Sequence, residues 1–259
     1  MSAIVVCVSR GSVWLEGGKL PVRTAAELQG QFRPLGQYRG LDVLWKLDLG
    51  EDMRFASARE LLGSEEEFAL VSQVLQLDDF FRSHAFCGVC GSATLASERS
   101  VFCELCTKTT WPRISPCVIV VLTDRGRVLL AQHVRHKTPL WTCVAGFIEV
   151  GETVESCVAR EVKEETNLEI TGLKYIGSQP WPFPSNLMLG FTARVKDPNE
   201  LLIDTEELAD ARWFPQNSLP KDLAPKGTMA RRLIGSIESS DKYSLPGHPS
   251  GNAIDSATH

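Results

Sequence analysis

The sequence predicts an α+β fold in three parts: a small N-terminal α+β domain, a cysteine-rich ribbon and a larger C-terminal domain. Three observations support it. Short apolar runs alternate with segments of helical period, two paired-cysteine motifs separate the outer parts, and one C-terminal helix carries carboxylates on its apolar face. We expect the parts to span 1–82, 83–110 and 111–240, and residues 241–259, which are polar and contain Gly and Pro, to be a disordered tail.

Composition narrows the class of protein. The 259 residues carry a formal net charge of −5 and 43% hydrophobic residues, which is ordinary for a soluble globular chain. The acidic balance argues against DNA binding over a broad basic surface, but it leaves room for recognition of a short RNA end. The first residues lack a basic leader and no apolar stretch reaches membrane-spanning length, so we expect neither a signal peptide nor a membrane span.

The elements follow from local periodicity. In the N-terminal domain, β-like runs at 3–8 and 41–47 precede a helical stretch with apolar residues at helical spacing. In the C-terminal domain the pattern predicts strands at 117–122, 128–132, 173–177, 187–195 and 211–214, a turn at 124–126, and helices at 153–166 and about 228–239.

The helix at 153–166 carries the strongest chemical signal. On a helical wheel Glu161, Glu164 and Glu165 fall within an arc of about 100°, together with Val154 and Val158. Carboxylates aimed at the protein interior repel one another, and divalent cations with oxygen ligands would remove that conflict. The alternative is a solvated helix face with an Arg160–Glu164 pair, which the arc disfavours.

The residues around this helix follow the pattern G-x5-E-x7-R-E-U-x-E-E-x-G-U, where U is aliphatic. The chain therefore resembles the Nudix hydrolases in Gly146, Glu152, Arg160 and the three glutamates. It departs where Asn167 replaces a glycine. We expect a left-handed backbone there, which Asn tolerates. The resemblance implies an α/β/α sandwich for the C-terminal domain and hydrolysis of a nucleoside diphosphate linked to another group.

Cys87, Cys90, Cys103 and Cys106 form two CxxC pairs separated by twelve residues. Four thiolates with no open position predict a closed, structural zinc site. Two disulfides or an iron–sulfur cluster are the alternatives. The remaining cysteines lie in apolar contexts, and free thiols beside a metal cluster favour a reducing compartment, so we expect a cytoplasmic protein.

The segment SQPWPFPSN at 178–186 narrows the substrate class. Alternating prolines and aromatics predict a rigid loop suited to a base-binding wall, with a structural corner packed on the sheet as the alternative. The segment resembles the SQPWPFPxS signature of the NADH pyrophosphatases of the NudC type, except that Asn186 replaces the final serine. The zinc ribbon directly before the Nudix domain and several blocks between 81 and 234, among them LLAQHVRH at 129–136, extend this resemblance.

The resemblance implies roles for individual residues. Divalent metal, Mg²⁺ or Mn²⁺, would be bound by Glu161, Glu164, Glu165, Glu207 and the carbonyl of Ala145. Glu206 is the competing neighbour of Glu207, and Arg160 would pair with Glu152. The substrate would be bound by Arg59, Glu98, Trp111, Phe147, Gln179, Pro180, Trp181, Pro182, Phe183, Pro184, Ser185, Asn186 and Ala230.

In the family, Phe147 and the aromatic at position 111 would sandwich the nicotinamide, with Trp111 in place of the usual tyrosine. For Arg59, Glu98 and Ala230, an ordinary surface or packing role stays open. Basic residues at 125, 127 and 135–137 are candidates for contact with the body of an RNA.

The expected reaction is metal-dependent hydrolysis of the pyrophosphate bond of NAD(H), giving NMN(H) and AMP. The same bond occurs at the 5′ end of NAD-capped RNA, where cleavage leaves a 5′-monophosphate. The family also implies a homodimer. Two rival functions stay open: a Nudix hydrolase for another substrate such as ADP-ribose, and a non-catalytic NAD-binding regulatory module.

Overall fold

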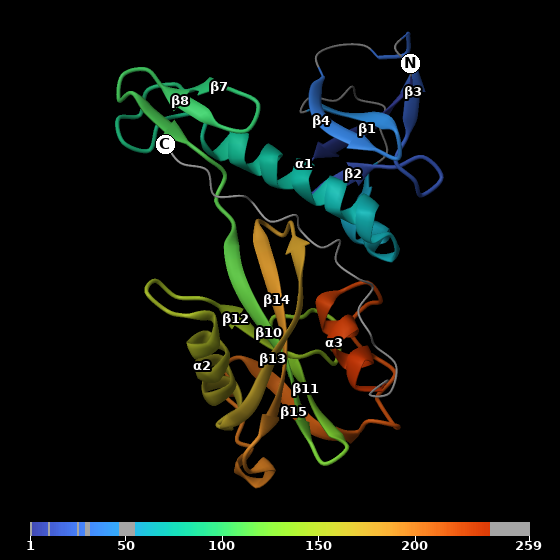
Figure 1. Ribbon diagram of the computed structural model, residues 1–259, viewed down its shortest axis with the longest axis vertical. Coiled ribbons are helices and arrows are strands. Elements are labelled where there is room, and N and C mark those ends of the chain that lie inside the picture. Colours follow the sequence, from blue (N-terminus) through green and yellow to red (C-terminus); the bar gives the residue numbers. More distant parts are fainter. Residues whose placement is uncertain (1, 10, 25, 29–31, 47–54, 239–259) are drawn as a thin grey trace, which may run out of the picture.

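The computed structural model describes residues 2–9, 11–24, 26–28, 32–46 and 55–238, and the predicted tail at 241–259 lies outside this range. The described chain forms two lobes (Figure 1). The upper lobe in that view holds the N-terminal sheet, a long helix and the cysteine ribbon. The lower lobe is a second sheet with one helix on each face. No described helix is long and apolar enough to cross a membrane.

The N-terminal lobe is a mixed sheet covered by one long helix. The sheet has the order β4-β5-β1-β2-β6, with β3 paired to β1. Its strands are β1 (Ser2–Ser9), β2 (Ser12–Trp14), β3 (Val22–Thr24), β4 (Arg33–Tyr38), β5 (Leu41–Lys46) and β6 (Phe55–Ser57). The short 3-10 helix η1 (Ala58–Gly63) leads into α1 (Glu65–Ser83), which buries Phe68, Val71 and Leu75 against the sheet. The predicted strands and helix are thus confirmed, apart from Leu47, which lies outside the described residues.

The ribbon follows α1 and rests on the N-terminal sheet. It contains β7 (Leu95–Ala96), β8 (Val101–Cys103) and β9 (Lys108–Thr110). The guanidinium of Arg33 on β4 donates to the carbonyl of Ser97 at 3.2 Å and lies 4.4 Å from the centre of the Phe81 ring. These contacts hold the ribbon, the helix and the sheet together as one lobe.

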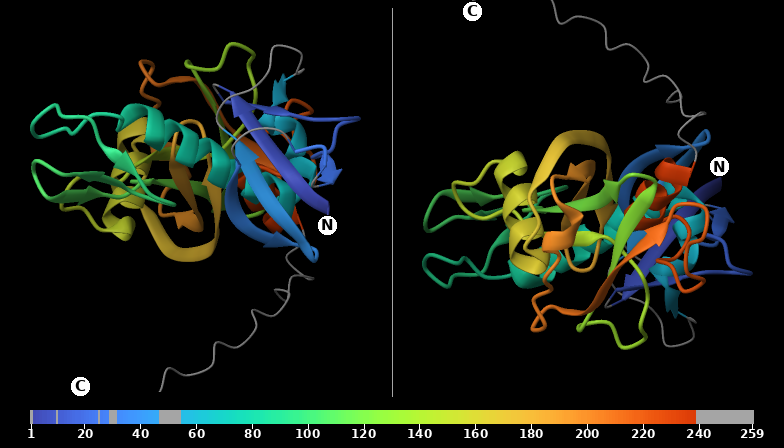
Figure 2. Two further views of the ribbon diagram at one scale, coloured as in Figure 1. Left: turned by 90° about the horizontal axis from the view of Figure 1, so that it is seen from above. Right: turned by 90° about the horizontal axis from the view of Figure 1, so that it is seen from below.

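The lower lobe is an α/β/α sandwich, as the family resemblance implies. Its sheet has the order β13-β14-β10-β11-β15, with β12 paired to β10. The strands are β10 (Ser115–Asp124), β11 (Arg127–His133), β12 (Val144–Phe147), β13 (Ile170–Trp181), β14 (Asn186–Val195) and β15 (Leu208–Pro215). Helix α2 (Val154–Thr166) covers one face and α3 (Met229–Glu238) covers the other, each over its own apolar core (Figure 2). A 3-10 turn, η2 (Pro198–Glu200), precedes β15.

The prediction of a loop across 178–186 is wrong for its first half. Gln179, Pro180 and Trp181 complete β13 and pair with Met188, Leu187 and Asn186, so only residues 182–185 form the turn. Proline lacks an N–H donor, but β13 is the edge strand of its sheet, where that donor is not needed.

The two lobes meet along this segment. The rings of Trp181 and Phe183 pack against the core of the N-terminal lobe, and the Phe68 and Trp181 ring centroids are 5.9 Å apart. Arg232 of α3 pairs with Glu65 of α1 at 3.0 Å. At Gly227, just before α3, an added Cβ would lie 1.9 Å from the carbonyl oxygen of Leu62 in η1. The lobes are therefore in direct backbone contact beside the start of α3.

We expect Gly227→Ala to destabilise the protein by about 2 kcal/mol or more, because a Cβ would collide with the Leu62 backbone and φ at this residue is +86°. The measurement is urea unfolding. Gly63→Ala is the control, since its Cβ would meet nothing within 4 Å. Equal midpoints for the two variants would contradict the tight interlobe contact.

Candidate active site

Helix α2 is delimited by its own end residues. The side chain of Thr153 accepts a hydrogen bond from the Ser156 N–H at 3.2 Å and caps the start. At the other end Asn167 has φ of 59°, which confirms the left-handed backbone expected where the family has glycine. The Asn167 side chain also donates to the carbonyl of Glu200 at 3.1 Å. The departure from the family pattern therefore leaves the helix end intact.

Two of the three glutamates of the predicted arc lie against the sheet, and the prediction is wrong for Glu164, which lies at the edge of that face. Glu165 is 1% exposed and Glu161 is 8% exposed, whereas Glu164 is exposed at the rim. Gly146 on β12 makes room for this arrangement, since a Cβ there would lie 1.9 Å from the Glu161 carboxyl carbon. Both carboxylate oxygens of Glu165 are buried and have no hydrogen-bond partner among the described residues. Such oxygens suit a bound cation.

Burial and like charge raise the pKa values of the two inner glutamates. The pKa of Glu165 rises to about 8, chiefly through burial and then through the charges of Glu207 and Glu161. The pKa of Glu161 is raised mainly by burial, which Arg160 partly offsets. Glu207, rather than Glu206, is the neighbour whose charge acts on both. Main-chain hydrogen bonds bring it there: the N–H of Asp204 donates to the carbonyl of Glu165 at 3.0 Å.

Arg160 organises the outer carboxylates. Its guanidinium donates to Glu152 at 2.8 and 2.9 Å, to Glu161 at 2.8 Å and to Glu164 at 2.9 Å. It also donates to the carbonyl of Phe147 at 3.0 Å, which ties α2 to the end of β12. The Arg160 charge holds the pKa of Glu152 at about 2. The predicted Arg160–Glu152 contact is present, and Arg160 orients two of the candidate metal ligands.

The glutamate group is looser than the cysteine group. Among the described residues, only the four cysteines place three or more ligand atoms within 4.8 Å of one another. Mutual repulsion between carboxylates accounts for the difference, because cations would have to draw them together. The backbone of Ala145 is close enough to Glu165 to affect its pKa. The carboxylate oxygens of this group fit a hard divalent cation.

A cavity of about 370 Å³ lies on the opposite face of the sheet from α2. Among the predicted site residues, Arg59, Ala145, Gln179, Trp181 and Ala230 line it. The other lining residues are Leu62, Ile119, His133, Arg135, His136, Leu140, Thr142, Cys143, Met188, Ala224, Pro225, Thr228 and Met229. Ala145 faces the cavity while its neighbour Gly146 faces Glu161, because successive residues of a strand point to opposite faces. The cavity and the carboxylates thus meet across β12.

Gln179 has a structural task at this site. Its side-chain nitrogen donates to the carbonyl of Gly227 at 2.7 Å, and its oxygen accepts from the N–H of Met229 at 2.7 Å. Both contacts involve backbone at the start of α3, the helix that contributes Ala230. Gln179 therefore fixes the wall of the cavity as well as lining it.

Other predicted substrate residues lie away from the cavity. Phe183 packs on the N-terminal core, Asn186 is buried at the start of β14, and Pro180, Pro182, Pro184 and Ser185 are not among the lining residues.

Phe147 is 52% exposed on the cavity side of β12, and Trp111 is 62% exposed. Phe147 pairs with Cys117 of β10, and Trp111 lies six residues before Cys117 in the chain. Six residues of extended chain span about 20 Å, so Trp111 lies far from Phe147. This geometry does not form a sandwich between Phe147 and Trp111 of the same chain. Glu98 is exposed on the ribbon.

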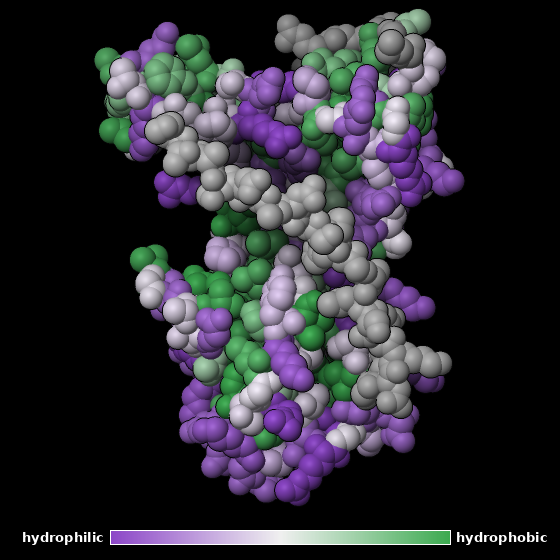
Figure 3. All heavy atoms as spheres, in the orientation of Figure 1, coloured by the Kyte–Doolittle hydropathy of each residue, from purple (hydrophilic) through white to green (hydrophobic). Residues whose placement is uncertain are grey.

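Thirteen lining residues were not predicted as pocket residues, and three of them have basic side chains: His133, Arg135 and His136. The sequence showed them only as part of a block of family resemblance and, for the last two, as candidate RNA contacts. The structure divides that basic group, because residues 125 and 127 flank the β10–β11 turn at the far end of β11. That end of the molecule is largely hydrophilic (Figure 3). His133 is buried, its Nε2–H donates to the carbonyl oxygen of Cys143 at 3.2 Å, and burial lowers its pKa to about 4.

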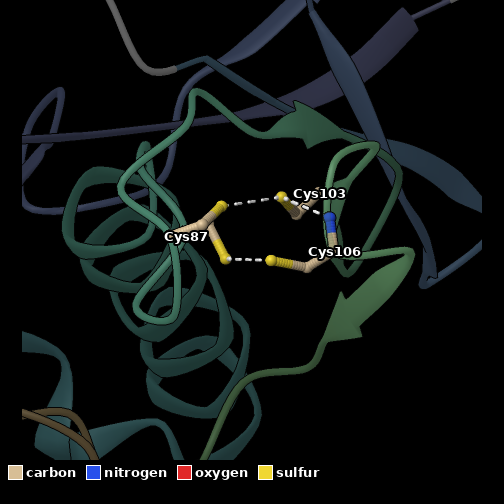
Figure 4. Close-up of side chains that lie close together, drawn as sticks. Cys87, Cys103 and Cys106 are labelled. Atoms are coloured by element: carbon tan, nitrogen blue, oxygen red, sulfur yellow. Dashed lines mark hydrogen bonds between the residues drawn. The ribbon is translucent and has the colours of Figure 1, made fainter.

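The four ribbon cysteines form a compact cluster. The Sγ atoms of Cys87 and Cys106 are 4.0 Å apart and those of Cys90 and Cys103 are 3.6 Å apart (Figure 4). A tetrahedral zinc with Zn–S bonds of about 2.3 Å places its sulfurs about 3.8 Å apart, whereas a disulfide needs about 2.05 Å. The N–H groups of Val89 and Cys106 donate to the sulfurs of Cys87 and Cys103, as thiolates in a metal knuckle require. The cluster fits a structural zinc ion.

Known proteins of one family match this chain. Residues 112–233 match the model of the NUDIX domain. The chain is 44% identical over 228 residues to the NAD-capped RNA hydrolase NudC of Pectobacterium carotovorum, with 86% of each chain covered. It is 42% identical over 237 residues to NAD-capped RNA hydrolase NudC of Vibrio vulnificus, covering 88% of this chain and 90% of that one. Among solved structures, a NUDIX hydrolase from Nitrosomonas europaea has a TM-score of 0.49 and 22% identity, and the match covers 60% of this chain and 90% of that chain.

We expect Glu165→Gln to stabilise the protein at high pH when zinc is retained and no other divalent metal is present. The folded-state pKa of about 8 exceeds the ordinary 4.5, so the contribution of Glu165 to stability is fully present below about pH 4.5 and is lost as the pH rises through about 8. The free energy of unfolding of the variant should exceed that of the parent by about 1–4 kcal/mol at pH 8.5 and by little at pH 5. The measurement is chemical denaturation at both pH values.

Glu164→Gln is the matched control for this prediction, since Glu164 is exposed on the same helix. It should show no such pH-dependent gain. If Glu165→Gln were no more stable than the parent at pH 8.5, the buried like-charge conflict would be absent.

Proposed function

The chain belongs to the NudC family of NUDIX hydrolases, and on this premise we propose that it hydrolyses the pyrophosphate bond of NAD(H) and of NAD-capped RNA. One observation carries the proposal: Glu165 presents two buried, unpartnered carboxylate oxygens beside Glu161, next to a cavity that the SQPWPFP segment helps to line. The relatives named NAD-capped RNA hydrolase NudC suggest the substrate class.

The proposed hydrolysis consumes one water molecule for each pyrophosphate bond cleaved. The water oxygen bonds to one phosphorus, the bond from that phosphorus to the bridging oxygen breaks, and the bridging oxygen leaves with the other phosphate. A carboxylate of the cluster accepts the water proton. The products are NMN(H) and AMP from the free cofactor, and NMN and 5′-monophosphate RNA from the capped transcript.

Each group of residues has its own role in the proposed reaction. Mg²⁺ or Mn²⁺ would be held by Glu161, Glu164, Glu165, Glu207 and the Ala145 carbonyl. When bound, the ion would neutralise phosphate oxygens and lower the pKa of a water molecule. Arg160 keeps Glu161 and Glu164 in place through its hydrogen bonds. The apolar cavity next to Ala145 takes one base and its sugar and excludes water from the reacting bond.

The wider assembly is also part of the proposal. Large apolar side chains are exposed near the start of β10 and the end of β12, namely those of Trp111, Ile114, Phe147 and Val150. Such exposure suits a homodimer, in which a second copy could bring Trp111 to the Phe147 that its own chain does not reach. Light scattering that found only monomer would remove this part. Free buried thiols and a cofactor substrate favour the cytoplasm as its location.

We expect the purified protein with Mg²⁺ or Mn²⁺ to cleave NADH and NAD-capped RNA, and Glu165→Gln to lower both rates by about 100-fold or more. Chromatography of the nucleotide products gives the measurement. Glu155→Gln, an exposed change on the same helix, is the control and should retain full activity. ADP-ribose serves as a competing substrate.

The outcomes separate the rival functions. Preferential cleavage of ADP-ribose would favour a hydrolase of different specificity. Binding of NAD without turnover of any substrate would favour a regulatory module. Cleavage of NADH and capped RNA that disappears in Glu165→Gln supports the proposal.

We expect one equivalent of zinc per chain, held by the four cysteines, and Cys103→Ser to lose it. Because Cys103 is buried and anchors β8, its replacement should also lower the thermal midpoint of the upper lobe. Atomic emission and calorimetry provide the measurements. Cys7→Ser is a control for loss of a buried thiol outside the cluster. Retention of zinc in Cys103→Ser would rule out this site.

A further inference from the structure

Arg135 lines the cavity, and its charge also acts on the buried carboxyl of Glu165. It follows the end of β11, and the backbone on each side of it is fixed: the N–H of Val134 donates to the carbonyl of Glu207 at 2.9 Å, and the N–H of His136 donates to the carbonyl of His133 at 3.1 Å. The first of these bonds links the Arg135 turn directly to a proposed metal ligand. Arg135 therefore lines the cavity on a turn that is hydrogen-bonded to the backbone of Glu207.

The guanidinium of Arg135 has no partner in the described part of the chain. No carboxylate of the described residues lies within 4.0 Å of it, and it makes no hydrogen bond to the described part of the chain. Arg160, by contrast, binds three carboxylates of the same region. The charge of Arg135 still lowers the pKa of Glu165. It is thus near enough to act on the site, and it is left unpaired for a ligand.

The neighbouring residues make this wall polar without adding charge. His133 and His136 stand edge to face, with ring centroids 5.6 Å apart. The Nδ1 atom of His136 is buried and has no partner among the described residues, so the wall holds a second unsatisfied polar atom. Arg59 is the other permanently charged lining residue, and its guanidinium lies 3.9 Å from the centre of the Phe183 ring on the side of the N-terminal lobe.

We propose that Arg135 binds the pyrophosphate of the substrate from the cavity side and balances the charge of the phosphate that leaves. A guanidinium can donate to two phosphate oxygens at once, and it keeps its charge at all relevant pH values. Charge on the leaving phosphate grows as the bridging bond breaks, so a fixed cation at this position stabilises the transition state more than the ground state. This inference rests on the proposed function.

The test compares three variants with NADH as substrate. Arg135→Gln removes the charge, and Arg135→Lys keeps a charge but loses the two-pronged geometry. Arg194→Gln removes the same charge from an exposed residue of β14 that does not line the cavity. We expect Arg135→Gln to lower kcat/KM by about 10- to 100-fold, Arg135→Lys to lose less, and Arg194→Gln to stay within about twofold of the parent.

A binding measurement provides a readout that does not depend on turnover. Calorimetric titration without Mg²⁺ or Mn²⁺ compares AMP with adenosine and NMN with nicotinamide riboside. Arg135→Gln should weaken the binding of a nucleotide by about tenfold and leave the binding of the matching nucleoside unchanged, because Arg135 contacts only the phosphate. Equal weakening of nucleotide and nucleoside, or no weakening of either nucleotide, would overturn the assignment.

The failures of the two proposals are distinguishable. If the parent protein cleaves neither NADH nor capped RNA, the proposed function fails, and the binding comparison still judges Arg135. If the parent cleaves NADH and Arg135→Gln matches it in kcat/KM, the proposed function stands and the assignment of Arg135 is wrong.

Discussion

The site depends on the burial of like charges between α2 and β12. Glu165 is almost fully enclosed, Glu161 lies beside it, and the charge of Glu207 reaches both. The protein relieves only part of this repulsion, because Arg160 binds Glu161 and the outer carboxylates but not Glu165. The remaining negative charge is stable only as protonated carboxyl or with bound cations. The same conflict that costs stability would therefore favour the binding of cations at the proposed site.

Strand alternation joins this charge to the cavity. Ala145 points toward the α3 side, where the cavity lies, and Gly146 leaves room for Glu161 on the α2 side. Two adjacent residues of β12 thus connect the cavity with the buried carboxylates. In the proposed reaction, a substrate that fills the cavity would present its pyrophosphate to these carboxylates.

The N-terminal lobe is part of the site. Arg59 and Leu62 of η1 line the cavity, and the Gly227 backbone packs directly on Leu62. Trp181 serves both lobes, since it lines the cavity and also packs against Phe68. The segment that the sequence presents as a binding loop is therefore equally an interlobe joint. Pro180 fits because β13 is an edge strand, and Pro182 and Pro184 lie in the turn that follows it.

Local sequence determined the elements whose signals are local. The helical period placed Glu161 and Glu165 on the buried face of α2, the CxxC spacing predicted the thiol cluster, and the position after the helix predicted the left-handed Asn167. The tertiary structure alone decided which distant residues share the cavity, because that depends on how β11, η1 and α3 meet in space. It gave Gln179 two backbone partners near α3, turned Phe183 toward the N-terminal core, and brought Arg135 beside Glu207 and Glu165. Contacts between residues that are far apart in the chain leave no periodic trace in the sequence, so no local pattern could have shown them.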